Sequence, residues 1–478
     1  MENEKKLGTL RLTMFGIGLI LASGAFAIPG DFASSGAYPL ASLLGWAVAG
    51  IGMFSLCMCY LRLGIARPDL TSGLYTYARE GFGDFIGFSS AWGYWISALL
   101  AQITFLNMLF GTLGQIFPIF GDGANLFSVV CQSVIIWVLA AMILKGVNQA
   151  VSINAVVVAA KLMPVMALLV AIVFAKAFDP QVFMQNFTGE GSGMSLFEQV
   201  KSTTFITVWI FIGVEGAVVI SARAKTTKIA GRAAAISFLC MLAIYMMISI
   251  LSMCVMPTEE LAQLATPSVA CVLEHVVGPW GATLVNVAVI VSICGALFTY
   301  TILCVESASA PAMEGCFPTF FTKLNKHNAP INATIISTLV IQIFMIVIVF
   351  NDATYQVCYA LSTSMIMIPY LFSALYYAKV TFKKEGQLAA YTPGALTKER
   401  FIAVVGSIYG IWMLYSGGLS YLLATTVLYA LGLIIFVLGR KERNEKVFKG
   451  MESIIAIAIV VLAVIAAVMI ATGKLDVF

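Results

Sequence analysis

The 478-residue sequence has few charged residues. Asp, Glu, Lys and Arg together make up 10% of it, whereas hydrophobic residues make up 60%. So few ionisable side chains exclude a soluble globular protein of this length and predict a polytopic membrane protein. The net charge of +4 is small. Because the basic residues gather in the loops after even-numbered apolar runs, they indicate membrane topology and no nucleic-acid partner.

The sequence also lacks the patterns of a metal site or a disulfide framework. Its ten cysteines have no paired spacing, and it has only two histidines. We therefore expect no metal and no cofactor. Low-complexity tracts and an extramembrane domain are absent, and no small-residue cleavage signature follows the first apolar run, so we expect the first helix to be retained. Function is then expected inside the helix bundle.

Apolar runs predict about thirteen transmembrane helices, because only helices satisfy their own backbone in lipid. The positions of Lys and Arg predict a cytoplasmic amino terminus and an extracytoplasmic carboxyl terminus. The eleventh run is short, and is either tilted or merged with the twelfth through Gly417 and Gly418. The expected spans are 10–33, 40–63, 85–109, 126–144, 153–174, 203–221, 234–255, 283–305, 334–350, 355–377, 402–415, 419–438 and 454–470.

The sixth run contains a carboxylate, Glu215, between Gly213 and Gly216. An ionisable residue near the membrane centre costs roughly 2.5 to 3.5 kcal/mol and usually faces a cavity, a pathway or a partner. The pattern therefore predicts a binding site. In the alternative interpretation Glu215 caps backbone groups that a local helix break frees, and the glycines serve close packing. The two interpretations are compatible, because broken helices build the central sites of many transporters.

The first run is interrupted in a similar way, by small residues around Ser23 and Gly24 and then by Pro29. Two glycine-interrupted spans five helices apart indicate an inverted repeat whose half-helix ends converge on one site. Amides exposed at the first break would suit a carboxylate. Carbonyls freed in the sixth span, near Trp209 and Ile212, would suit an ammonium group.

These motifs resemble the amino acid/polyamine/organocation superfamily, and within it the basic amino acid/polyamine antiporters, most closely the arginine/ornithine exchangers. The resemblance covers nearly the whole chain, and residues 209–216 are its most specific part. It implies an all-α membrane protein with a five-plus-five inverted repeat, the first repeat at about 10–176 and the second at about 200–378. The remaining helices, at about 401–471, would be peripheral. The motifs that carry the resemblance are residues 22–26, Arg67, Pro68, Gly73, Tyr75, Tyr77, residues 92–95, residues 209–216, Pro369 and Tyr370.

The resemblance also implies a substrate site, carried over residue by residue from the family's arginine/agmatine antiporters. Three positions depart from the family pattern: Ala22 replaces a glycine, Gln102 an asparagine, and Tyr300 a tryptophan that stacks on the guanidinium. The head group is expected against Ile20, Ser23, Gly24, Trp209 and Ile212. The side-chain pocket is expected at Tyr94, Ser97, Ala98, Gln102, Tyr300 and Ser362, with Glu215 beside it.

Three residues are candidates for coupling or gating. Lys161 lies about 12 Å inside its span, and in relatives of the superfamily a lysine here takes the place of a sodium ion. The alternative is a lysine that binds carbonyls for structure alone. Glu306 ends the eighth expected span and is either an interfacial charge, which ranks first, or a gate near the inner vestibule. Glu215 is the third candidate.

The sequence thus predicts a secondary amino acid transporter of the bacterial cell membrane that exchanges arginine for ornithine by alternating access. Two alternatives stay open: proton-coupled uptake, and exchange of another amino acid or amine, such as histidine for histamine or agmatine for putrescine. An enzyme is not expected, because no nucleophile, paired acids or metal cluster has usable spacing. A channel fits the paired helix breaks less well than alternating access. The expected partners are amino acid or amine substrates and the lipid bilayer, with a homodimer as one possibility.

Overall fold

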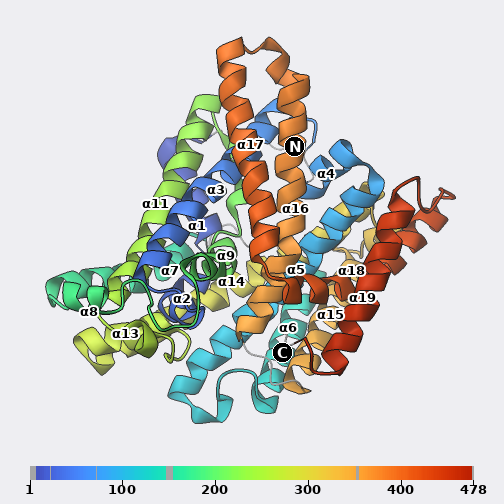
Figure 1. Ribbon diagram of the computed structural model, residues 1–478. Coiled ribbons are helices and arrows are strands. Elements are labelled where there is room, and N and C mark those ends of the chain that lie inside the picture. The colour runs from blue at the N-terminus through green and yellow to red at the C-terminus, as the bar shows by residue number, and fades with distance from the viewer. Residues whose placement is uncertain (1–6, 22, 71–72, 147–153, 351–354, 476–478) are drawn as a thin grey trace.

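The computed structural model describes residues 7–21, 23–70, 73–146, 154–350 and 355–475, and only the backbone at 154–161 and 222 (Figure 1). Within these ranges the chain forms helices and no strand longer than an isolated bridge. The α-helices are α1 Thr9–Ile20, α2 Ile28–Ser34, α3 Pro39–Ala66, α4 Leu74–Phe82, α5 Asp84–Ile116, α6 Leu126–Leu144, α7 Asn154–Phe174, α8 Pro180–Gln185, α9 Leu196–Ile210, α10 Ala217–Arg223, α11 Thr227–Met253, α12 Thr258–Leu261, α13 Ser268–Val277, α14 Pro279–Met313, α15 Ile331–Phe350, α16 Tyr355–Lys383, α17 Pro393–Ser416, α18 Leu419–Glu442 and α19 Glu452–Ala471.

This all-α membrane architecture confirms the predicted fold class. Nine helices of the described chain are long and apolar enough to cross a membrane, and the bent pair α9 and α10 makes a tenth. The total of about thirteen spans stays a prediction. The eleventh expected run belongs to α17, a helix of 24 residues. It is not merged with the twelfth, because α17 ends at Ser416 and Gly418, with φ +71°, precedes α18.

Burial separates the central helices from the peripheral ones. In the most apolar stretch of each helix, 94% of the residues of α5 are buried, against 17% in α19. Helix α5 packs on both α14 and α16, whereas α19 packs on α18 at the edge of the molecule (Figure 1). Aliphatic side chains on the outer face of α19 therefore suit contact with lipid.

The two halves of the chain pack corresponding helices against each other in the same pairs. Helix α1 packs on α11, and α9 packs on α3. Short helices α4 and α13 each end at a glycine, Gly83 with φ +93° and Gly278 with φ +90°, and a long helix starts at the next residue. Packing of α5 on α16 in one half corresponds to packing of α14 on α7 in the other. These equivalences support the two expected repeats, whose boundaries stay a prediction.

Both expected helix breaks are present. The first span stops at Ile20, continues as the 3₁₀ turn η1 Ser23–Phe26, and resumes as α2, with Pro29 in its first turn. Ala22 of the first-break motif lies outside the described residues. The sixth span stops at Ile210, passes through the 3₁₀ turn η3 Val214–Gly216, and resumes as α10 at an angle of 48°.

The two breaks touch each other through glycines. Gly213 has φ +114°, a left-handed conformation that L side chains rarely adopt, and a Cβ added to it would lie 2.3 Å from the carbonyl oxygen of Leu19. A Cβ on Gly24 would lie 2.5 Å from Nε1 of Trp209. Glycine is therefore required at position 213 for backbone conformation and close approach, and at position 24 for close approach.

We expect Gly213→Ala to lower the thermal unfolding temperature of the detergent-solubilised protein and to abolish transport. The left-handed conformation costs an alanine about 1 to 3 kcal/mol, and the backbone of Leu19 must also move. Gly231→Ala is the matched control in the helix interior, because its Cβ would meet only Leu61, at 3.9 Å. A Gly213→Ala protein as stable as Gly231→Ala would contradict this account of the break.

Candidate substrate site

A cavity of about 930 Å³ lies between the two helix breaks and helices α5 and α14. Its wall runs from Ser23 at the first break to Gly73 and Pro311, near the face of the molecule where the chain begins. This volume is within the usual range of small-molecule sites. The cavity therefore connects the centre of the bundle with one face.

Glu215 joins the broken sixth helix to two neighbouring helices. Its Oε2 accepts a hydrogen bond from the amide of Gly213 at 2.9 Å and one from the hydroxyl of Tyr370 at 2.5 Å. Its Oε1 accepts a hydrogen bond from the hydroxyl of Tyr94 at 3.3 Å. Glu215 thus satisfies an amide freed by the break and also lines the cavity, so both interpretations of its role describe the same side chain.

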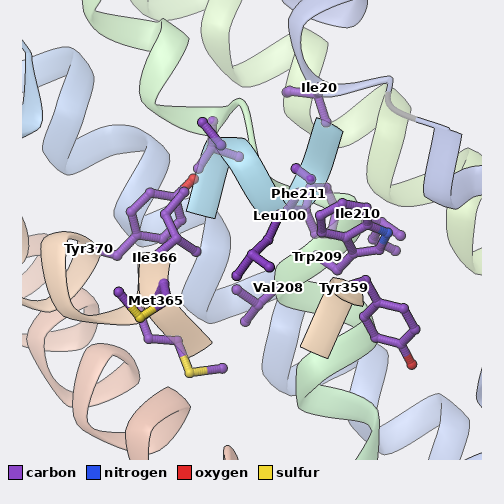
Figure 2. Packing of buried hydrophobic residues seen from close by; sticks show 14 of the residues in the cluster. Ile20, Leu100, Val208, Trp209, Ile210, Phe211, Tyr359, Met365, Ile366 and Tyr370 are labelled. Atoms are coloured by element: carbon purple, nitrogen blue, oxygen red, sulfur yellow. The ribbon is translucent and has the colours of Figure 1, made fainter. Parts of the chain in front are cut away.

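Aromatic rings form the wall around the break. The ring of Phe105 lies edge-on to Tyr300, at 4.7 Å between centroids, and 6.1 Å from the ring of Trp209. Trp209 stacks on Tyr359 at 5.9 Å (Figure 2). Tyr359 does not line the cavity, so the indole of Trp209 separates the cavity from it.

Six of the twelve residues predicted to bind substrate line this cavity. The hydroxyl of Ser23 is buried and has no hydrogen-bond partner among the described residues, so it is available to a ligand. The six are Ser23, Tyr94, Trp209, Ile212, Glu215 and Tyr300.

Two other predicted residues, Ile20 and Gly24, do not line the cavity, and their contacts at the first break involve the backbone. The carbonyl of Ile20 accepts a hydrogen bond from the hydroxyl of Tyr245 at 3.0 Å. Gly24 allows η1 to approach Trp209. A turn hydrogen bond already occupies one carbonyl of the second break: the amide of Ile212 donates to the carbonyl oxygen of Trp209 at 3.2 Å. Recognition of the substrate head group by the two breaks stays a prediction.

The remaining four predicted residues lie behind the wall, where α5 packs on α14 and α16. The hydroxyl of Ser97 lies 3.1 Å from that of Ser362. Gln102 donates to the hydroxyl of Thr301 at 2.9 Å, and the carbonyl of Ala98 accepts from the thiol of Cys304 at 3.4 Å. None of the four is in the cavity wall of this structure, and their role in substrate recognition stays a prediction.

The two expected gating residues outside the breaks have different outcomes. Helix α14 continues to Met313, so Glu306 lies seven residues inside the helix rather than at its end. Its side chain is exposed and lines the cavity, and its role as a gate stays a prediction. The side chain of Lys161 lies outside the described part of the structure, so its role in place of sodium is untested.

Sequence reasoning missed the roles of several residues in or next to the cavity wall. Phe105 lies on α5 three residues after Gln102, but its ring and not that amide reaches the cavity. Tyr370 was noted only as part of a motif, although its hydroxyl holds Glu215. Tyr75, on α4, was also noted only as part of a motif, and it extends the wall towards the open face. Only the pairing of a buried carboxylate with nearby tyrosines could have indicated the role of Tyr370.

The charged side chains among the described residues of the cavity wall all have one sign. Glu215 and Glu306 are acidic, and no Lys, Arg or His is among the described residues that line it. The described residues also include no group of three His, Cys, Asp or Glu side chains that could hold a metal ion. The site therefore offers carboxylates, aromatic faces and backbone groups to an organic cation.

A bundle with paired broken helices around a central cavity defines the class: a multi-pass membrane transporter. The chain belongs to the amino acid permease family, whose model matches residues 7–477. It is 38% identical to the arginine/ornithine antiporter of Pseudomonas aeruginosa, over 98% of this chain and 97% of that protein. It is 34% identical to the L-lysine transport protein of Corynebacterium glutamicum, over 96% and 94%, and 33% identical to the arginine/agmatine antiporter of Chlamydia abortus, over 99% and 98%.

We expect Glu215→Gln to reduce the transport rate at least tenfold while the amount of folded protein in the membrane changes much less. A glutamine has one acceptor oxygen in place of two, so Gly213, Tyr94 and Tyr370 can no longer all donate to it. Transport in proteoliposomes across a range of pH, together with the amount of protein inserted, measures the effect. Glu260→Gln is the control, because Glu260 is exposed in a loop helix. Normal exchange by Glu215→Gln at every pH would leave Glu215 with a structural role only.

Proposed function

We propose that this chain is an antiporter that takes up arginine in exchange for ornithine by alternating access. The observation that carries the proposal is the cavity with two carboxylates, Glu215 and Glu306, and no basic side chain among the described residues of its wall. Carboxylates and aromatic faces favour cationic substrates over neutral ones. The three relatives named above are arginine/ornithine, lysine and arginine/agmatine transporters, so the names agree on cationic amino acids and amines.

Alternating access would use the two breaks as hinges. The half-helices α2 and α10 are short and each is separated from its partner by irregular backbone, so each can tilt without unfolding a long helix. In this proposal the cavity is the inward pathway, the amino terminus is cytoplasmic, and the membrane is the bacterial inner membrane. The carboxyl terminus would be extracytoplasmic. Transport without catalysis and assembly as a homodimer remain part of the proposal.

The second candidate is proton-coupled uptake of an amino acid. Its motivation is the buried carboxylate of Glu215, which contacts two tyrosine hydroxyls and one amide and has no ion-pair partner among the described residues. Such a group can carry a proton when the broken helix rearranges. Exchange and proton coupling differ in what they require on the opposite side of the membrane.

We expect labelled arginine to enter proteoliposomes only when ornithine, arginine or a related amine is trapped inside. An exchanger cannot return its empty site across the membrane, so the internal substrate is required. The measurement is counterflow at zero membrane potential, with empty liposomes and with liposomes containing neutral amino acids as controls. Rapid uptake into liposomes without internal substrate, driven by a pH gradient, would select the proton-coupled alternative.

We expect Tyr300→Ala to weaken arginine binding by about 1 kcal/mol, or about fivefold in Kd, through loss of cation–π and packing contacts. Tyr300→Phe keeps the ring and is the matched control, and citrulline is the neutral counterpart of arginine. Isothermal titration calorimetry of the solubilised protein measures both ligands. An equal loss of affinity for arginine and citrulline would show that the ring does not recognise the cation. A loss of affinity in Tyr300→Phe as large as in Tyr300→Ala would show the same.

A further inference from the structure

A further carboxylate, Asp31, is buried on α2, on the side of the bundle opposite the open face of the cavity (Figure 1). Its side chain is 2% exposed. The carboxylate forms a hydrogen bond with the side chain of Gln356 of α16, which also donates to the hydroxyl of Ser34 at 3.2 Å. Gln356 is itself exposed, so a single side chain separates Asp31 from the outer surface.

Structural roles account for only part of the Asp31 carboxylate, which lies in the first turn of α2 and forms a hydrogen bond with Gln356. It forms no ion pair with any described residue, and no side chain caps the start of α2. Its Oδ2 has no hydrogen-bond partner. Leaving a buried carboxylate without a cation costs folding free energy, and in membrane proteins such residues usually serve a transport pathway.

Two tyrosines of α16 connect Asp31 with the substrate cavity. Gln356, next to Tyr355, bonds to Ser34 of α2 and so holds the start of α16 against α2. The Asp31 carboxylate interacts electrostatically with both Tyr355 and Tyr359. The ring of Tyr355 lies 5.4 Å from that of Tyr359, which in turn stacks on Trp209. Figure 2 shows this last contact, with Tyr359 directly beside the indole. A layer of Trp209, Tyr359 and Tyr355 therefore separates the cavity, on one side, from Asp31 on the other.

We propose that Asp31, Tyr355 and Tyr359 form an outer binding site that receives the guanidinium or ammonium group of a cationic substrate before it reaches the central cavity. A carboxylate beside two aromatic rings matches such a cation, because it offers both charge pairing and cation–π contact. The site is buried in this structure because the cavity is open to the other face. It becomes accessible when α2 and the start of α16 separate.

The site deepens the proposed exchange of cationic amino acids and rests on it. It also predicts an asymmetry, because Asp31 lies on the outer side of the aromatic layer and Glu306 on the inner side. Loss of Asp31 should affect capture of substrate from the outer face. Capture from the cytoplasmic face, where Glu306 lines the open cavity, should not change.

Asp31→Asn tests this inference in right-side-out spheroplasts and in inverted membrane vesicles. We expect the half-saturating arginine concentration to rise at least tenfold in spheroplasts and to change less than twofold in inverted vesicles. The inverted vesicles also report whether the variant is folded, because a misfolded protein transports from neither face. Asp31→Glu keeps the charge and should stay near the wild type on both sides.

Glu259→Gln is the control for general surface charge on the same face. Glu259 accepts a hydrogen bond from Tyr38 at 2.9 Å and from Asn186 at 3.1 Å. A hydrogen bond from its own backbone, together with these two, holds the pKa of Glu259 below its ordinary value, so it is ionised at neutral pH. We expect this variant to behave as the wild type, because its carboxylate is not beside the aromatic layer.

An unchanged half-saturating concentration in Asp31→Asn, an equal rise on both faces, or a rise as large in Glu259→Gln would overturn the outer site. The wild type separates this result from failure of the proposed function. Absence of arginine exchange by the wild type contradicts the proposed function, whereas normal wild-type exchange with an unaffected Asp31→Asn contradicts the outer site alone.

Discussion

The close approach of the two helix breaks is the constraint on which the rest of the structure depends. Gly213 leaves no room for a side chain against the carbonyl of Leu19, and Gly24 leaves none against Trp209. Backbone groups that a break frees within a bilayer must find partners inside the protein. Glu215 supplies one such partner, because its carboxylate accepts a hydrogen bond from the amide of Gly213. The hydroxyls of Tyr94 and Tyr370 donate to the same carboxylate and hold it in place. The position of the site follows, because Glu215 and Tyr94, which secure the break, also line the cavity.

The same constraint explains why the site is acidic and lies at the centre of the molecule. A carboxylate that stabilises a broken helix in an apolar bundle also creates a negative potential in the adjacent cavity. Glu306 adds a second charge nearer the open face. Aromatic rings close the other side, where Trp209 stacks on Tyr359. The result is a cavity with one open face and one closed face, which is the arrangement that alternating access requires.

Sequence patterns predicted the elements better than they predicted the lining of the cavity. The breaks near Ser23 and Gly213 were visible because glycines and a carboxylate are rare within long apolar runs. The extension of α14 beyond Glu306 was not visible, because Ser307, Ala308 and Ala310 are compatible with either a helix or a loop. Ser97 and Gln102 share α5 with Tyr94, yet they hydrogen-bond to Ser362 and Thr301 in neighbouring helices, since polar side chains without water bind the nearest partner.

The sequence by itself determined that this protein is a helical membrane protein and where its helices are interrupted, because apolar length, glycine and charge act locally along the chain. Only the tertiary structure decided which polar side chains reach the cavity. The rotation of each helix about its axis is set by its packing against neighbours and not by its own sequence. For that reason Phe105 lines the cavity and Gln102 does not, and Asp31 lies behind the rings of Tyr355 and Tyr359.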